Sequence, residues 1–85
     1  MMTDAYSIAL LGIIVQSGAT TKQLNSILSD YGEYVIGRMG IPHRERQLNI
    51  LSVALDAPQN VLNAIAGKIG VLEGISVKLV YAPTK

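Results

Sequence analysis

The sequence predicts an α+β domain whose strands and helices follow the order β-α-β-β-α-β. Three observations support this prediction: strand-length segments rich in leucine and β-branched residues, two segments with apolar residues at helical spacing, and a match between the two halves of the chain. The 85 residues suffice for one hydrophobic core, so we predict a single domain over residues 1–85. Hydrophobic residues make up 49% of the chain and charged residues 15%, which excludes an intrinsically disordered protein.

The first predicted strand covers residues 5–15. Its apolar residues occupy both odd and even positions, as in a strand with both faces buried. Residues 16–19 (Gln-Ser-Gly-Ala) have the composition of a turn. The apolar run is too short to span a bilayer, and the residues before it include an acid but no Lys or Arg, unlike a secretory signal peptide. We therefore expect a cytoplasmic protein that makes no membrane contact.

The first predicted helix begins at Thr20. Gln23 follows three residues later, which is the spacing of a capping box. Gly32 is expected to end the helix, because a glycine beyond the last turn can adopt a positive φ without steric cost. The apolar stripe of this helix consists of Leu24, Ile27, Leu28 and Tyr31.

Two strands joined by a hairpin follow. The second strand covers residues 33–41 and is expected to end at Pro42, and residues 43–45 form a short polar connection. The third strand covers residues 47–55 and is again apolar at both odd and even positions. This third strand therefore resembles the first, and both are expected at the centre of a sheet.

A second helix and a last strand complete the chain. Asp56 is a suitable N-cap, Pro58 fits the first turn, Gln59 completes a second capping box, and Gly70 is expected to end the helix. The last strand covers residues 75–81 and alternates apolar and polar side chains, as an edge strand does. The apolar stripe of this helix consists of Val61, Leu62, Ile65, Ala66 and Ile69.

The two halves of the chain match at an offset of 38 residues. The matching positions lie in the two helices and at their ends: Leu24-Asn25 with Leu62-Asn63, Ile27 with Ile65, and Gly32 with Gly70. Each half is thus one strand–helix–strand unit. We predict a ferredoxin-like βαββαβ sandwich, in which a four-stranded antiparallel sheet carries both helices on one face.

In this topology one face of the sheet has no helix to cover it. That open face would expose either Leu10 or Leu11 from the first strand, and either Ile50 or Leu51 from the third. A large apolar face is unusual on a soluble monomer, so we predict a homo-oligomer, a dimer or tetramer, formed through the open sheet face. The alternative is that small residues keep this face compatible with water, namely Ala9, Gly12, Ser52 and Ala54.

Composition excludes several classes of function. The net charge of +1 is too balanced for a nucleic-acid surface, so we expect no direct DNA binding. The chain has no cysteine, which excludes disulfides and thiolate metal sites, and its single histidine makes a metal site unexpected. No pairing of a nucleophile with a base, and no pair of carboxylates, is evident in the sequence. We therefore predict a protein that is not an enzyme and has no cofactor.

The densest polar segment covers residues 37–46, on the second strand and the hairpin. It holds all three arginines, the only histidine and two glycines. Arginine binds carboxylate and phosphate groups through two hydrogen bonds, so arginines that converge at the hairpin would bind a small anion. The alternative is a charged hairpin that prevents aggregation of an edge strand. The candidate ligand-binding residues in this segment are Arg38, Gly40, His43, Arg44 and Arg46.

Ser17 and Gly18 extend this candidate site. They lie between the first strand and the first helix, where backbone N–H groups at a helix start can bind an anion. The loop lacks the Gly-Lys-Ser/Thr pattern of a phosphate-binding loop, and helix capping alone would also explain its composition.

The segment YGEYVIGRMGIPHRE, the following strand, the LDAP sequence that opens a helix, and the final Ile-Ser-Val-Lys strand resemble the iron-only hydrogenase system regulator family. The most specific part is Gly-Arg-Met-Gly-Ile-Pro at residues 37–42. The resemblance implies an ACT-like sandwich, similar to the C-terminal domain of nickel-responsive repressors, and an oligomeric regulatory protein. The histidine-and-cysteine metal site of those repressors has no counterpart here, and the predicted first strand leaves no room before it for their DNA-binding segment.

From these observations we predict a transcription-associated regulatory module that is not catalytic, binds a small ligand and forms an oligomer. Since ACT-type domains typically bind amino acids, the resemblance implies an amino-acid carboxylate as a partner for Arg38 or Arg44. The alternative function is that of a structural or assembly protein that docks a partner through the hairpin at residues 37–46.

Overall fold

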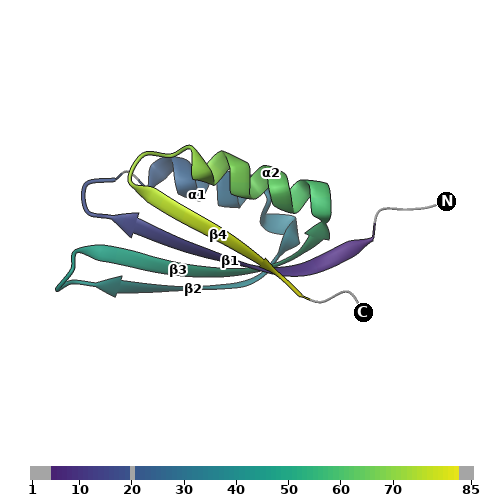
Figure 1. The fold of residues 1–85 in the computed structure, drawn as a ribbon, viewed down its shortest axis with the longest axis horizontal. Coiled ribbons are helices and arrows are strands. Elements are labelled where there is room, and N and C mark those ends of the chain that lie inside the picture. Colours follow the sequence, from purple (N-terminus) through teal and green to yellow (C-terminus); the bar gives the residue numbers. More distant parts are fainter. Residues whose placement is uncertain (1–4, 20, 83–85) are drawn as a thin grey trace.

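The computed structural model describes residues 5–19 and 21–82. The predicted order β-α-β-β-α-β is confirmed, with one short 3₁₀ helix added between the first helix and the second strand. Both helices lie on the same side of one sheet (Figure 1). The elements are β1 (Tyr6–Gln16), α1 (Lys22–Asp30), η1 (Gly32–Tyr34), β2 (Val35–His43), β3 (Leu48–Pro58), α2 (Gln59–Gly70) and β4 (Ile75–Tyr81).

The four strands form an antiparallel sheet in the order β2-β3-β1-β4. The expected placement is confirmed: β1 and β3 are central, and β2 and β4 are the edges. Gly12 of β1 stands at the middle of the sheet, paired with Ser52 on β3 and with Lys78 on β4. This arrangement is the ferredoxin-like fold predicted from the order and periodicity of the elements.

The core lies between the sheet and the two helices. On β1 every second residue from Ala9 to Val15 is buried, and the buried residues of β3 continue the same layer. The helices contribute Leu24 and Leu28 from α1 and Leu62, Ile65 and Ile69 from α2. Burying a side chain of this size stabilises a fold by about 1.5–3 kcal/mol. The 38-residue match therefore reflects packing, since Leu24 and Leu62 both enter this core.

Several predicted ends of elements are wrong. Pro42 does not end the second strand, because β2 continues through it to His43. An edge strand tolerates proline, since one of its sides has no neighbour that needs the N–H. The third strand likewise continues past its predicted end to Pro58. Asp56 therefore lies inside β3, and the capping box predicted for it does not form.

The glycines predicted to end the helices do mark their ends, since α1 ends at Asp30 just before Gly32 and α2 ends at Gly70. The positive φ expected of such a glycine is absent at both. Positive φ values occur instead at Gly18 (88°), Gly74 (78°) and Gln47 (56°). The predicted cap residue Thr20 lies outside the described residues. The structure has Thr21 at the N-cap position of α1, without a hydrogen bond from its side chain.

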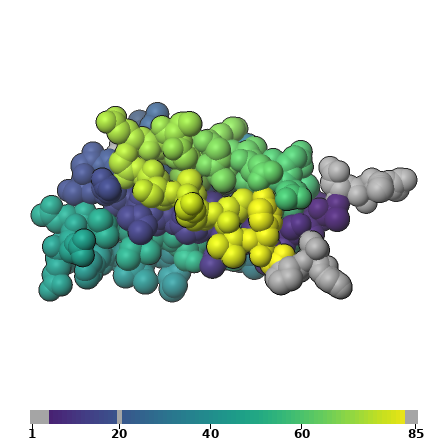
Figure 2. Space-filling view, in the orientation of Figure 1, coloured from purple at the N-terminus to yellow at the C-terminus, as the bar shows by residue number. Residues whose placement is uncertain are grey.

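The turns that carry the candidate site gather at one end of the sheet. The β1–α1 loop, the β2–β3 hairpin and the loop before β4 all lie at the left in Figure 1. In the space-filling view the hairpin side chains, in teal, form the lower part of this end (Figure 2). Of the helices formed by residues 5–19 and 21–82, none is long and apolar enough to cross a membrane.

Candidate functional site

A hollow of about 300 Å³ separates α1 from β2 on the helix side of the sheet. It exists because β2 extends beyond the cover of the helices, so that all its residues from Ile36 to His43 are exposed. Gly40 contributes no side chain to this part of the sheet. We call this space the α1–β2 hollow; its lining residues are Thr21, Leu24, Asn25, Arg38, Gly40, Ile41, Pro42, Asn49 and Leu51.

Arg38 is the cationic group of the α1–β2 hollow. It pairs in register with Val53, a fully buried residue, so both side chains point to the helix side of the sheet. The Arg38 Nη2 donates a long hydrogen bond, 3.4 Å, to the Asn25 Oδ1 on α1. This contact holds the guanidinium against the first turn of the helix, and its remaining N–H groups stay available to a ligand.

The first turn of α1 adds to the positive potential. Thr21 and Asn25 both line the α1–β2 hollow, and the Asn25 N–H donates to the Thr21 carbonyl at 2.9 Å. The backbone N–H groups of a first helical turn point out of the helix start, and the N-terminal end of the helix dipole is positive. Arg38 and this helix end therefore favour an anion on the same side of β2.

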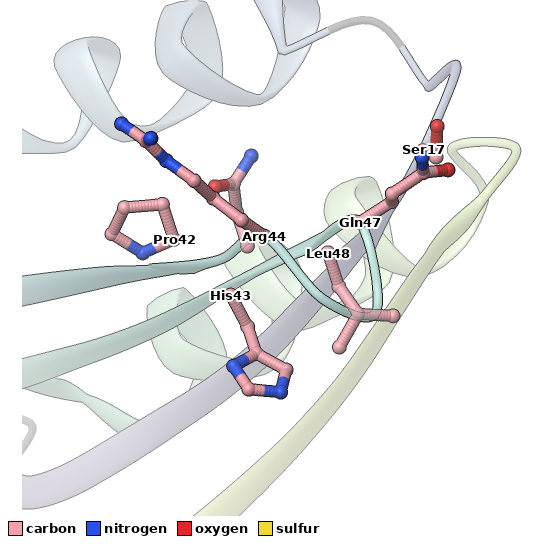
Figure 3. A pocket seen from close by; sticks show the side chains of 7 residues that line it. Ser17, Pro42, His43, Arg44, Gln47 and Leu48 are labelled. Carbon is pink, nitrogen blue, oxygen red and sulfur yellow. The ribbon is translucent and has the colours of Figure 1, made fainter.

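A second hollow, of about 370 Å³, lies next to the first and shares Pro42 and Asn49 with it. We call it the hairpin hollow; Ser17, His43, Arg44, Gln47 and Leu48 complete its lining. Arg44 extends toward α1 on the side of Pro42, whereas the His43 ring points to the other side of the hairpin (Figure 3). The structure thus places Arg44 beside the α1–β2 hollow and turns His43 away from it.

The remaining predicted residues lie apart from Arg38. Ser17 belongs both to the hairpin hollow and to a third hollow of about 560 Å³, which Gly18 also lines. Glu73 also lines this third hollow, and its negative charge would repel an anion. Arg46 lies in the exposed hairpin turn and is not among the residues that line these three hollows.

Sequence reasoning missed Asn25 and Asn49. Asn49 could have been noticed, because it is a polar residue at the same parity of the third strand as the buried Leu51 and Val53. Asn25 gives no comparable indication, since only the packing of α1 against the sheet brings it to Arg38. In the part of the chain that the structure describes, no group of three or more His, Asp or Glu side chains could hold a metal ion.

The open face of the sheet is the second notable surface. The two choices left by the sequence are resolved: Leu10 and Ile50 are exposed there, while Leu11 and Leu51 are buried under the helices. Of the small residues expected to keep the open face compatible with water, Ala9 lies in the core instead, whereas Gly12, Ser52 and Ala54 do belong to that face. A hollow of about 420 Å³ lies over Gly12.

Comparisons with known proteins agree with the fold. The family model described as "TM1266-like: Iron-only hydrogenase system regulator, putative" matches residues 7–79. Among solved structures, the chain is similar to that of "uncharacterized protein TM1266 from Thermotoga maritima", with 28% identity and a TM-score of 0.88. The match covers 92% of this chain and 99% of that one. No curated protein matches the chain.

Proposed function

Because the chain belongs to the TM1266-like family of iron-only hydrogenase system regulators, we propose that it is a regulatory protein that senses a small anionic ligand. It works without catalysing a reaction and as an assembly of identical chains. The observation that supports ligand binding is the position of Arg38, which Asn25 holds at the mouth of the α1–β2 hollow beside the positive end of a helix.

The chemistry of the α1–β2 hollow favours a small carboxylate. A guanidinium can donate two parallel hydrogen bonds to a carboxylate, and Arg44 in the neighbouring hairpin hollow adds a second positive charge. The amides of Asn25 and Asn49 provide further donors and acceptors. Leu24 and Leu51 offer an apolar wall. An amino acid has both parts, a carboxylate and a side chain that such a wall can contact.

The lining of the α1–β2 hollow supports binding rather than catalysis. It holds an arginine, asparagines, a threonine and apolar residues, and it contains no histidine and no carboxylate. His43, the residue best suited to move a proton near neutral pH, points to the opposite side of the hairpin. A ligand bound at Arg38 would therefore meet no general base within this hollow.

Binding is tested by measuring the thermal unfolding of the protein with a panel of amino acids and other small carboxylates. A ligand that binds only the folded state raises the melting temperature. For a carboxylate that does so, isothermal titration calorimetry should show at least about tenfold weaker binding to the Arg38→Ala variant, since a charged hydrogen bond contributes roughly 1.5–3 kcal/mol.

Arg46→Ala is the matched control, because it removes the same charge from a turn that does not line the α1–β2 hollow. Equal losses of affinity in the two variants would assign the effect to net charge and would contradict the proposed site. If no compound in the panel raises the melting temperature, ligand sensing is wrong, and the hairpin at residues 37–46 becomes the site where a partner docks.

A further inference from the structure

The open face of the sheet has a regular arrangement of large and small side chains. Register places the residues of the four strands in rows across the sheet, in the order β2, β3, β1 and β4. The row through Leu10 reads Gly37, Ala54, Leu10, Val80. In this row the large side chains lie on β1 and β4, and the half toward β2 is almost flat.

The next two rows distribute their large side chains differently. The row through Gly12 has them on both edge strands, and the row through Ile14 has them toward β2. The row through Gly12 reads Met39, Ser52, Gly12, Lys78, and it contains the hollow over Gly12. The row through Ile14 reads Ile41, Ile50, Ile14, Ser76, with its large residues toward β2. The large side chains therefore lie on opposite halves of the face in the rows through Leu10 and Ile14, on either side of the row through Gly12.

The area of this face suits a stable interface between proteins. Strands of 7 to 11 residues make up the sheet. With ~3.3 Å per residue and ~4.8 Å between strands, they present a plane of roughly 600 Å². A standard interface buries about 800 Å² of accessible surface on each partner, and a surface of side chains has more accessible area than its plane. Leu10 and Ile50 remain 47% and 37% exposed in the single chain.

We propose that a second copy of this chain covers the open face, with a two-fold axis that runs parallel to the strands between β1 and β3. The inference rests on the assembly of identical chains proposed above and defines its geometry. Under this axis, β1 of one copy lies over β3 of the other, and β2 lies over β4. Each row then faces the same row of the second copy, read in the reverse direction.

This axis brings every large side chain over a small one in the row through Leu10, and it does the same for Ile41 in the row through Ile14. In the first of these rows Leu10 faces Ala54 of the other copy, and Val80 faces Gly37. In the row through Ile14, Ile41 faces Ser76, while Ile50 and Ile14 face each other. Such alternation lets two sheets interdigitate at the ~10 Å separation typical of face-to-face packing.

An axis that runs across the strands fits less well. If it passed through the row of Gly12, it would place Lys78 of one copy over Lys78 of the other in a largely apolar interface, where like charges repel. The axis along the strands places Lys78 opposite Met39 instead. The flexible Met39 side chain can adapt to the aliphatic part of the lysine.

Gly12 provides independent support for a partner on this face. A Cβ atom added there would contact only the Lys78 carbonyl oxygen, at an ordinary 3.9 Å, so the single chain has room for a side chain. Glycine in the middle of a strand lowers stability. The single chain therefore offers no packing reason for a glycine here, whereas a second sheet lying against β1 does.

The geometry is tested by crosslinking, because the native chain has no cysteine. Met39 and Lys78 lie on opposite edges of one sheet, three strand spacings or about 14 Å apart, but face each other across the proposed interface. A variant with Met39→Cys and Lys78→Cys, treated with a short bis-maleimide, should yield a product of twice the chain mass on a denaturing gel. Each single-cysteine variant should yield little.

The outcomes separate the geometry from the assembly itself. Efficient crosslinking of either single variant would show an axis across the strands and would overturn the proposed arrangement. An oligomer that gives no crosslinked product in the double variant would place the interface on another face, which also overturns it. A compact monomer in light scattering at micromolar concentration would contradict the assembly in the proposed function, while the ligand measurements with Arg38→Ala would still stand.

A charged substitution provides a second test that does not depend on crosslinking. Leu10→Lys should convert the oligomer to a folded monomer, with an unchanged circular dichroism spectrum, because Leu10 is exposed and does not enter the core. Val71→Lys is the matched control, since Val71 is 82% exposed just beyond the end of α2, away from the open face. An oligomer that survives Leu10→Lys would contradict the proposed interface.

Discussion

Gly74 lies in the loop between α2 and β4, and both its backbone and its surroundings require a glycine. Its φ is 78°, and an added Cβ atom would lie 2.9 Å from the Cβ atom of Ala19. The Gly74 carbonyl also accepts a hydrogen bond from the Gln16 N–H at 2.9 Å. This loop therefore closes against the end of β1, next to the β1–α1 connection.

Gly74→Ala should lower the free energy of unfolding by about 2–3 kcal/mol, of which the left-handed backbone accounts for about 1–2 kcal/mol and the contact with Ala19 for the rest. Gly18→Ala is the control, because Gly18 has a φ of 88° but nothing within 4 Å of the added atom. It should show the backbone cost alone. Urea unfolding measures both, and equal losses would mean that the contact with Ala19 does not matter.

The candidate site shows how much of a binding site can be predicted from single residues of the sequence. The arginines of the hairpin segment could be recognised from composition, but the different places that its side chains take in the fold could not. The prediction that Pro42 ends the second strand hid the alternation that sends His43 and Arg44 to opposite sides of the hairpin. Asn25 could not be linked to Arg38, because the distance between them depends on where α1 lies over the sheet.

At the scale of elements, three tyrosines connect β1, the end of α1 and η1, and a lysine links them to α2. The ring centroid of Tyr34 lies 6.4 Å from that of Tyr31 and 6.3 Å from that of Tyr6. The Lys68 Nζ on α2 lies 5.1 Å from the centroid of the Tyr31 ring. Partial burial, followed by the negative charge of Glu33, raises the pKa of Tyr34, and a hydrogen bond with Tyr31 raises the pKa of Lys68.

These two shifts predict that stability decreases in alkaline solution. A raised pKa means that the folded state keeps its proton where the unfolded state loses it. The contributions are therefore complete below the ordinary values of about 10 for tyrosine and about 10.4 for lysine, and they are lost as the pH rises through the folded values. Urea unfolding should show lower stability at pH about 11 than at pH about 8.

Tyr34→Phe keeps the ring and removes the titrating hydroxyl, so this variant should lose less stability between the two pH values. Tyr81→Phe serves as a comparison, because Tyr81 lies outside the aromatic group and its hydroxyl donates to the Asn63 Oδ1 at 2.6 Å. If Tyr34→Phe loses as much stability as the native chain, the shift at Tyr34 does not contribute.

The periodicity of apolar residues predicted the helices and strands correctly, but it predicted their ends less well. Both apolar stripes form helices, and β4 has the predicted bounds. The capping box at Asp56 failed because β3 pairs with β1 as far as Pro58, and the ladder includes Asp56 opposite Ile8. Local capping preferences contribute about 1 kcal/mol, so a longer ladder with buried neighbours overrides them.

At the scale of the whole molecule, the order of elements was sufficient to predict which strands are central. It could not predict which side of β1 is open, because Leu10 and Leu11 are equally apolar. A strand with apolar residues at both odd and even positions does not indicate on which side the helices lie. That ambiguity has a physical origin. Both faces of β1 have to be covered, one by the helices and the other, in the arrangement proposed above, by a second chain.

Covering this face couples folding to association, which predicts a melting temperature that depends on protein concentration. Mass action stabilises a folded chain that assembles, so the native protein should melt at a higher temperature as its concentration rises from about 1 to about 100 μM. Leu10→Lys should remove most of this dependence. Gly12→Val should weaken it while leaving the single chain folded, because the space over Gly12 is open. Differential scanning calorimetry across this range provides the measurement, and a native melting temperature that stays constant would show that the chain folds without a partner.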